Sequence, residues 1–180
     1  MSLRHTLALP LLIGLFGCTT NASASPLDDL LDAVEQRLRL AEAVALHKWD
    51  QRSPVHAPER ERQVLERVAE EAPQHGLTPE RAQAFFGDQI ESNKFVQYSL
   101  LNTWHYRGEA PDTERKDLET EIRPELDALQ ERLLSDLSQF DQHALPDCHK
   151  QLAIALSARP GDALLQHAMV RATGQLCPLP

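Results

Sequence analysis

Apolar residues recur every three or four positions along most of the chain, which is the spacing of α-helices that bury one face. The first such stripe predicts a helix over residues 26–50, since proline is favoured in a first helical turn and Arg52-Ser53-Pro54 follows as a stop. The second predicts a helix that begins at Pro58 and ends near His75-Gly76, because glycine commonly follows a helix.

The start of a third helix is marked by Thr78-Pro79-Glu80. These residues supply a capping hydroxyl, a proline for the first turn and an acid at the positive end of the helix dipole. We expect this helix to reach residues 104–106, and the polar stretch 107–112 to form a loop.

The last part of the chain predicts three further helices. The fourth covers roughly residues 113–140, and Pro124 inside it should either kink it or mark its true start. Two short helices follow over residues 148–157 and 163–176, the second capped by Asp162. The pattern therefore predicts one all-α domain, a bundle of about six helices.

Composition narrows the classes of protein that remain. The chain has 180 residues, of which 42% are hydrophobic and 25% charged, as in ordinary soluble globular domains. Only 5% are aromatic and 7 are glycine, which disfavours an all-β fold. The formal charge of −9 excludes the broad basic surface that nucleic-acid binding needs, although a local cationic pocket remains compatible with it.

The N-terminus has the layout of a secretory signal peptide. Its apolar run, residues 7–16, is short for a membrane span, and Ala22-Ser23-Ala24 is a suitable cleavage site. We expect cleavage after Ala24, leaving a domain over residues 25–180 in the periplasm or outside the cell, without a membrane anchor. The alternative is a lipoprotein anchored at Cys18, because residues 15–18 resemble a lipobox.

Export also changes how the cysteines are interpreted. Removal of residues 1–24 leaves Cys148 and Cys177, and a pair of cysteines in an oxidising compartment predicts one disulfide. The alternative is a metal site built from His143, Cys148 and His149, but no CxxC or HExxH motif accompanies them. We therefore expect a disulfide and no metal.

Several polar residues are not explained by a helical bundle with a purely structural role. Arg37 and Lys48 are eleven residues apart in one helix, so they share a face close to the apolar stripe. Cations beside a core are unfavourable unless an anion meets them. Asn93 and Gln97 are four apart and share a face of the third helix, while Arg60 lies in the first turn of the second. The spacing suggests that cations and amides converge on a small anion.

These residues lie in segments that resemble a known family. The segments are Gln36-Arg37-Leu38, VALHKW at 44–49, Pro58-Glu59-Arg60-Glu61 and DQIESNKFVQYSL at 88–100. In them the chain resembles the all-helical, AroQ-type chorismate mutases, and specifically the secreted (gamma) subclass. The signal peptide and the paired late cysteines fit that subclass.

The resemblance implies that chorismate, a dicarboxylate, rearranges to prephenate in one pericyclic step, on the route to phenylalanine and tyrosine. No cofactor or metal is implied. Arg37, Arg60 and Arg123 match positions that hold the two carboxylates, a task suited to planar guanidinium groups. Lys48 and Gln97 match positions that donate to the breaking ether oxygen, where negative charge develops.

The resemblance assigns two further residues and leaves one assignment open. Glu61 matches the position that accepts from the ring hydroxyl, and Asn93 lies where the family has a small polar residue near a substrate carboxylate. The register of Arg123 depends on counting across a variable loop, so Arg115 and Arg132 are alternatives. Ala57 departs from the family, which often has aspartate there, and we expect lower affinity as a result.

Two other functions compete with catalysis. A binding protein on the same fold would hold a small dicarboxylate without turning it over, and a partner-binding bundle would leave the polar residues exposed on different faces. The resemblance also implies that the whole site lies within one chain. It suggests a homodimer, the state often found in the subclass, but the sequence leaves the oligomeric state open.

Overall fold

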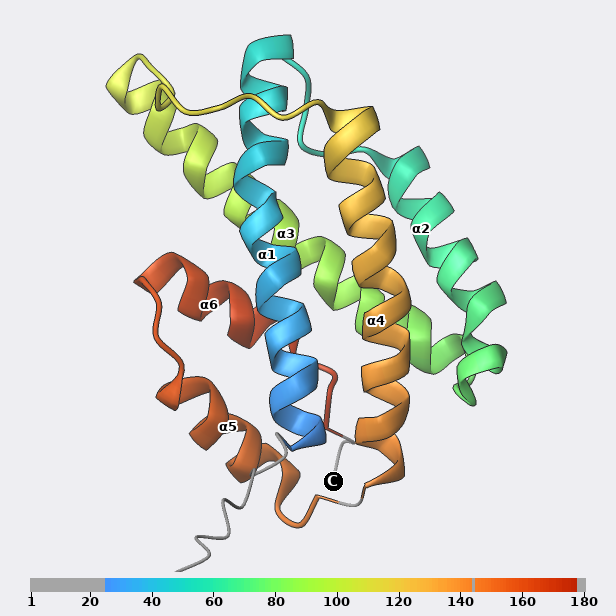
Figure 1. The fold of residues 1–180 in the computed structure, drawn as a ribbon. Helices are drawn as coiled ribbons and strands as arrows, with labels where there is room; N and C mark the ends of the chain where they lie inside the picture. Colours follow the sequence, from blue (N-terminus) through green and yellow to red (C-terminus); the bar gives the residue numbers. More distant parts are fainter. Residues whose placement is uncertain (1–24, 144, 178–180) are drawn as a thin grey trace, which may run out of the picture.

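A computed structural model describes residues 25–143 and 145–177, and over these ranges the chain forms a bundle of six α-helices and two short helical segments, without a strand (Figure 1). The predicted signal peptide and Cys18 lie outside the described residues. The α-helices are α1 (Pro26–Gln51), α2 (Pro58–Glu71), α3 (Pro79–Arg107), α4 (Arg123–Gln142), α5 (Cys148–Ala158) and α6 (Ala163–Ala172). The predicted all-α class is confirmed.

Most helix ends follow from local chemistry. The hydroxyl of Thr78 accepts a hydrogen bond from the backbone N–H of Arg81, and the carboxylate of Asp162 accepts one from Leu165, as the caps predicted. A 3₁₀ segment, η1 (Ala72–His75), continues α2 and ends at Gly76, whose φ of 73° is the left-handed conformation that glycine favours.

The fourth predicted helix begins later than expected. Residues 113–117 are not helical, and a five-residue π-helical segment, η2 (Leu118–Ile122), precedes α4. Pro124 lies in the first turn of α4, where its missing N–H leaves no hydrogen bond unmade. It therefore marks the start of α4, which is one of the two outcomes that the sequence predicted.

The last predicted helix is also shorter than expected, because α6 ends at Ala172 and residues 173–176 form turns. Tertiary contacts hold this segment. Asp88 of α3 accepts from the backbone N–H of Gln175 at 2.8 Å, and Arg81 donates to the Gln175 carbonyl at 2.7 Å.

Helix α1 lies at the centre of the bundle, where it packs against α3 and α4 (Figure 1). Helix α2 packs on α3, and α6 packs on α3 and α1. The core is apolar, and its largest fully buried members include Leu30, Leu31, Phe85, Phe86, Leu133 and Leu134. No helix in the part that the structure describes has both the length and the apolar character needed to cross a membrane.

The predicted disulfide is present. Cys148 at the start of α5 is bonded to Cys177, which follows α6, and their Cα atoms are 5.8 Å apart. The cross-link joins the two short helical regions, as the sequence predicted. It also occupies the sulfur that a metal site with His143 and His149 would need.

Candidate active site

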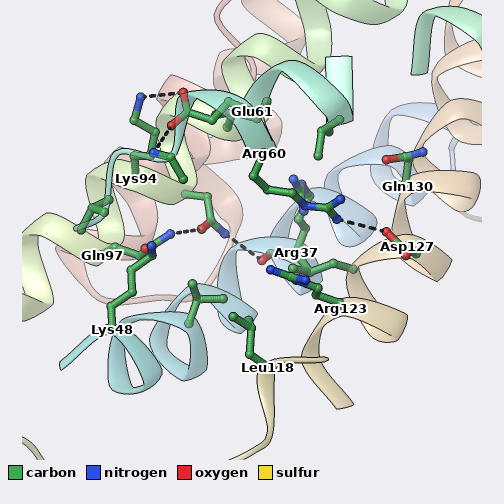
Figure 2. A pocket seen from close by; sticks show the side chains of 17 residues that line it. Arg37, Lys48, Arg60, Glu61, Lys94, Gln97, Leu118, Arg123, Asp127 and Gln130 are labelled. Atoms are coloured by element: carbon green, nitrogen blue, oxygen red, sulfur yellow. Dashed lines mark hydrogen bonds and ion pairs between the residues drawn. The ribbon is translucent and has the colours of Figure 1, made fainter. Parts of the chain in front are cut away.

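A cavity of about 200 Å³ lies between α1, α2, α3 and the start of α4, and Figure 2 shows the side chains around it. All seven residues predicted for the substrate site line it: Arg37, Lys48, Arg60, Glu61, Asn93, Gln97 and Arg123. Val44, Val55, Val64, Ile90, Leu118 and Leu126 form apolar parts of the wall. The convergence excludes the arrangement in which these polar residues are scattered over different faces.

The cavity is positively charged although the whole chain carries −9. Five cationic side chains and two carboxylates line it. Arg37, Arg60 and Arg123 gather on one side, and Lys48 and Gln97 lie on another (Figure 2). A small elongated dianion would meet cations at both places.

Arg37 is the most deeply buried of these cations, with 8% of its surface exposed. Burial, and then the positive charge of Arg60, lowers the pKa of Arg37 to about 10, while Asp127 acts in the opposite direction. Its buried Nε has no hydrogen-bond partner among the described residues. A bound carboxylate would supply both the missing acceptor and the missing negative charge.

The other two arginines of the cavity are held at its rim by carboxylates. Arg60 lies 3.7 Å from Asp127, and Arg123 is paired with Glu119 of η2. The two alternatives to Arg123 are engaged elsewhere. Arg115 binds Asp50 at 2.8 Å and Arg132 binds Asp136 at 3.3 Å, and neither lines the cavity.

Lys48 reaches the cavity from α1, and its Nζ donates to the carbonyl of Pro54 at 2.6 Å. Burial lowers the pKa of Lys48, and the charge of Glu61 opposes that shift. The ammonium has three N–H donors, so two remain for a ligand.

Gln97 and Asn93 form a buried amide pair on α3, in which Gln97 Nε2 donates to Asn93 Oδ1 at 2.6 Å. Asn93 Nδ2 in turn lies 3.5 Å from the carbonyl of Arg37. Among the described residues, the second N–H of the Gln97 amide has no acceptor and its buried Oε1 has no donor. The pair is thus held in place but has hydrogen-bonding capacity left.

Glu61 is held at both oxygens. Its Oε1 accepts from the backbone N–H of Ala57 at 3.0 Å, its Oε2 lies 3.1 Å from the Nζ of Lys94, and His56 lies 3.4 Å away. Burial acts to raise the pKa of Glu61, but the hydrogen bonds from Ala57 and Lys94 outweigh it and leave the pKa below its ordinary value. Glu61 is therefore an ionised acceptor.

Three polar residues of the cavity wall were missed from the sequence: Lys94, Asp127 and Gln130. Lys94 follows Asn93 directly within the segment that resembles the family. Asp127 and Gln130 are three apart on α4, a spacing that places them on one face, but nothing local indicates which helix they meet. Gln130 donates to Glu71 at 2.8 Å and so links α4 to α2.

Comparison with known proteins agrees with this geometry. Residues 28–98 match the family described as chorismate mutase type II. The chain is 31% identical over 158 residues to the secreted chorismate mutase of Mycobacterium tuberculosis, with 85% of this chain and 79% of that protein covered.

Solved structures of chorismate mutases are similar over their full length. The enzyme from Burkholderia thailandensis is 33% identical in sequence and superimposes with a TM-score of 0.79. The match covers 86% of this chain and 100% of the Burkholderia chain. The enzyme from Burkholderia phymatum shares 38% identity with a TM-score of 0.76, and covers 87% and 100%. This chain therefore belongs to the type II, all-helical AroQ family of chorismate mutases.

Proposed function

We propose that this protein is an exported chorismate mutase, which rearranges chorismate to prephenate, and that the cavity around Arg37 and Lys48 is its active site. The observation that carries the proposal is the convergence of arginines, a lysine and an amide on one small cavity in a family of chorismate mutases. The secreted relative from Mycobacterium tuberculosis supports the assignment to an exported enzyme.

The rearrangement is intramolecular, so the protein has to impose a conformation and stabilise developing charge. An extended substrate must fold into a compact, chair-like shape before its bonds exchange. Carboxylate contacts on one wall and donors on another would hold that shape, which pre-organises the reacting atoms. Apolar side chains form other parts of the cavity wall and would shield the reacting part of the substrate from water.

We assign the substrate carboxylates to Arg37, Arg60 and Arg123. The buried guanidinium of Arg37, with its unpartnered Nε, supports a role for that residue in gripping a carboxylate. Arg60 and Arg123 are each paired with a single exposed or half-exposed carboxylate, a contact that an incoming substrate group can replace at little cost.

We assign the ether oxygen to Lys48 and Gln97. As the ether bond breaks, negative charge grows on that oxygen, and two fixed donors in a partly buried site would stabilise it. The two free N–H groups of Lys48 and the second N–H of the Gln97 amide support this role. Glu61 would accept from the ring hydroxyl, and Asn93 would fix Gln97 and approach a carboxylate.

The finer location is part of the same proposal. We infer cleavage after Ala24 and residence in the periplasm or outside the cell. Ser25 would then be the first residue retained, and its hydroxyl caps α1 by accepting from the N–H of Asp28 at 3.1 Å. The N-terminal mass of the protein recovered from the periplasm tests the cleavage site, and lipid modification at Cys18 would contradict it.

Turnover is the test that separates an enzyme from a dicarboxylate-binding protein. The exported, disulfide-bonded protein should remove chorismate with saturation kinetics, followed by ultraviolet absorbance, and prephenate should appear in equal amount. A folded protein that binds chorismate, as shown by a raised melting temperature, but leaves it unchanged would overturn the catalytic assignment.

A further inference from the structure

Lys94 is a cation of the cavity wall for which the proposed mechanism has no role. It projects from α3 with 15% of its side chain exposed, which is unusually buried for a lysine. Its ammonium lies 3.1 Å from Oε2 of Glu61 and 2.8 Å from Oε1 of Glu91. Glu61 lines the cavity, whereas Glu91 does not.

The contact with Glu61 joins two helices, since Glu61 lies in the first turn of α2 and Lys94 near the middle of α3. The other oxygen of Glu61 is held by the backbone N–H of Ala57. Figure 2 shows Lys94 and Glu61 side by side at the cavity wall. Because each carboxylate oxygen can accept more than one hydrogen bond, the fixed group still has capacity for a substrate hydroxyl.

Other charged groups face Glu61, but they are placed differently. His56, in the loop before α2, lies 3.4 Å from Oε1, and the charge of Glu61 acts to raise the pKa of Lys48 on α1. Arg60 precedes Glu61 on α2 and is paired with Asp127, and the carboxylate of Glu91 is the second ion-pair partner of the Lys94 ammonium. Among the described side chains, Lys94 alone bonds Oε2.

We propose that Lys94 is a positioning residue, which orients the Glu61 carboxylate so that it accepts a hydrogen bond from the ring hydroxyl of the substrate. This inference rests on the proposed function, because it assigns Glu61 to substrate binding. It makes the Lys94–Glu61 pair a determinant of affinity for substrates that carry a hydroxyl at that position.

The pair of variants Lys94→Met and Glu91→Gln tests the proposal. Lys94→Met keeps the apolar stem but removes the charge, and Glu91→Gln removes the outer ion pair while leaving the contact with Glu61. A hydrogen bond to the ring hydroxyl acts on bound substrate and transition state alike, so its loss raises KM more than it lowers kcat. For a partly exposed ion pair we expect kcat/KM to fall about fivefold in Lys94→Met, to be unchanged in Glu91→Gln and to recover in Lys94→Arg.

Two readouts separate positioning from a merely structural role. Without the Lys94 charge the pKa of Glu61 rises, so the acidic limb of the kcat/KM profile should move to higher pH. In a double-mutant cycle, Lys94→Met should have little further effect in the Glu61→Gln background. Additive losses, or a Lys94→Met enzyme indistinguishable from wild type, would overturn the inference.

A measurement without turnover keeps this inference separate from the proposed function. The Glu61 side-chain carboxyl can be titrated by carbon-13 NMR in the wild type and in Lys94→Met, or in Lys94→Gln if the first variant does not fold. We expect a higher pKa without Lys94. An unchanged titration would refute the role of Lys94, whereas absence of turnover by the wild type would refute only the enzymatic assignment.

Discussion

Replacement of Lys48 by alanine is the sharpest test of how this protein would accelerate its reaction. The change removes one cation from the cavity and leaves Arg37, Arg60 and Arg123 to hold the carboxylates. If Lys48 donates to the ether oxygen, the interaction strengthens as that bond breaks. The loss should then fall on kcat, with a smaller change in KM.

The magnitude follows from the surroundings of the ammonium. Lys48 is partly desolvated, which is why its pKa lies below the ordinary lysine value, and charge interactions there are stronger than at an exposed site. Removal of one such donor from a developing oxyanion typically costs about 2.7–4 kcal/mol, or about 10²- to 10³-fold in kcat. The folded state loses the hydrogen bond to the Pro54 carbonyl, which is worth about 1 kcal/mol, and the attraction between Lys48 and Glu61.

The assay compares initial rates of chorismate loss over a range of concentrations in the wild type, Lys48→Ala and Lys150→Ala. Lys150 is exposed on α5 and does not line the cavity, so its replacement is the matched control. Thermal unfolding of each protein separates catalytic from structural loss. If kcat of Lys48→Ala lies within about threefold of the wild-type value, far less than the expected loss, donation to the breaking bond is refuted.

Further predictions follow from the same contacts. Burial lowers the pKa of Lys48, so its charged form is lost at a lower pH than in a free lysine, whose pKa is 10.5. We therefore expect kcat/KM to stay constant from neutral to mildly alkaline pH and to decline before pH 10.5 is reached. Because an amide donates a hydrogen bond at any of these pH values, a steep loss between about pH 6 and 8 would contradict the role of Gln97. Gln97→Glu should shift the optimum to lower pH, because only a protonated carboxyl donates, and a pH–rate profile measures this. Arg37→Met should lower kcat/KM at least about 100-fold yet raise the melting temperature, because it removes a buried charge whose Nε has no partner in the part of the chain that the structure describes. A lower melting temperature would contradict this prediction. Reduction of the Cys148–Cys177 disulfide should lower the free energy of unfolding by about 3–4 kcal/mol in urea titrations, and an unchanged midpoint would show that the cross-link does not constrain the unfolded chain.

Helix positions were largely predictable because their determinants are local. Apolar periodicity located the six helices, and caps such as Thr78 and Asp162 act on backbone groups three residues away. The errors occur where local preference competes with tertiary contacts. Residues 173–176 have no strong helix breaker except Gly174, yet contacts with Arg81 and Asp88 hold them as turns.

The residues of the candidate site also differ in how far local sequence could predict their positions. Helical geometry alone predicts that Arg37 and Lys48 share one face of α1 and that Asn93 and Gln97 share one face of α3. The family resemblance then assigned their roles. It could not settle the register of Arg123 across a variable loop, and the structure places this arginine in the cavity while Arg115 and Arg132 bind elsewhere.

Which charges meet across helices depends on tertiary packing. The contacts of Lys94 with Glu61 and of Asp127 with Arg60 join residues more than thirty positions apart, and no periodicity in the chain encodes them. They arise from how the helices pack, which depends on the shapes of many buried side chains at once. Local sequence therefore specifies the helices and the chemistry that each one carries, whereas packing specifies the cavity and the contacts made within it.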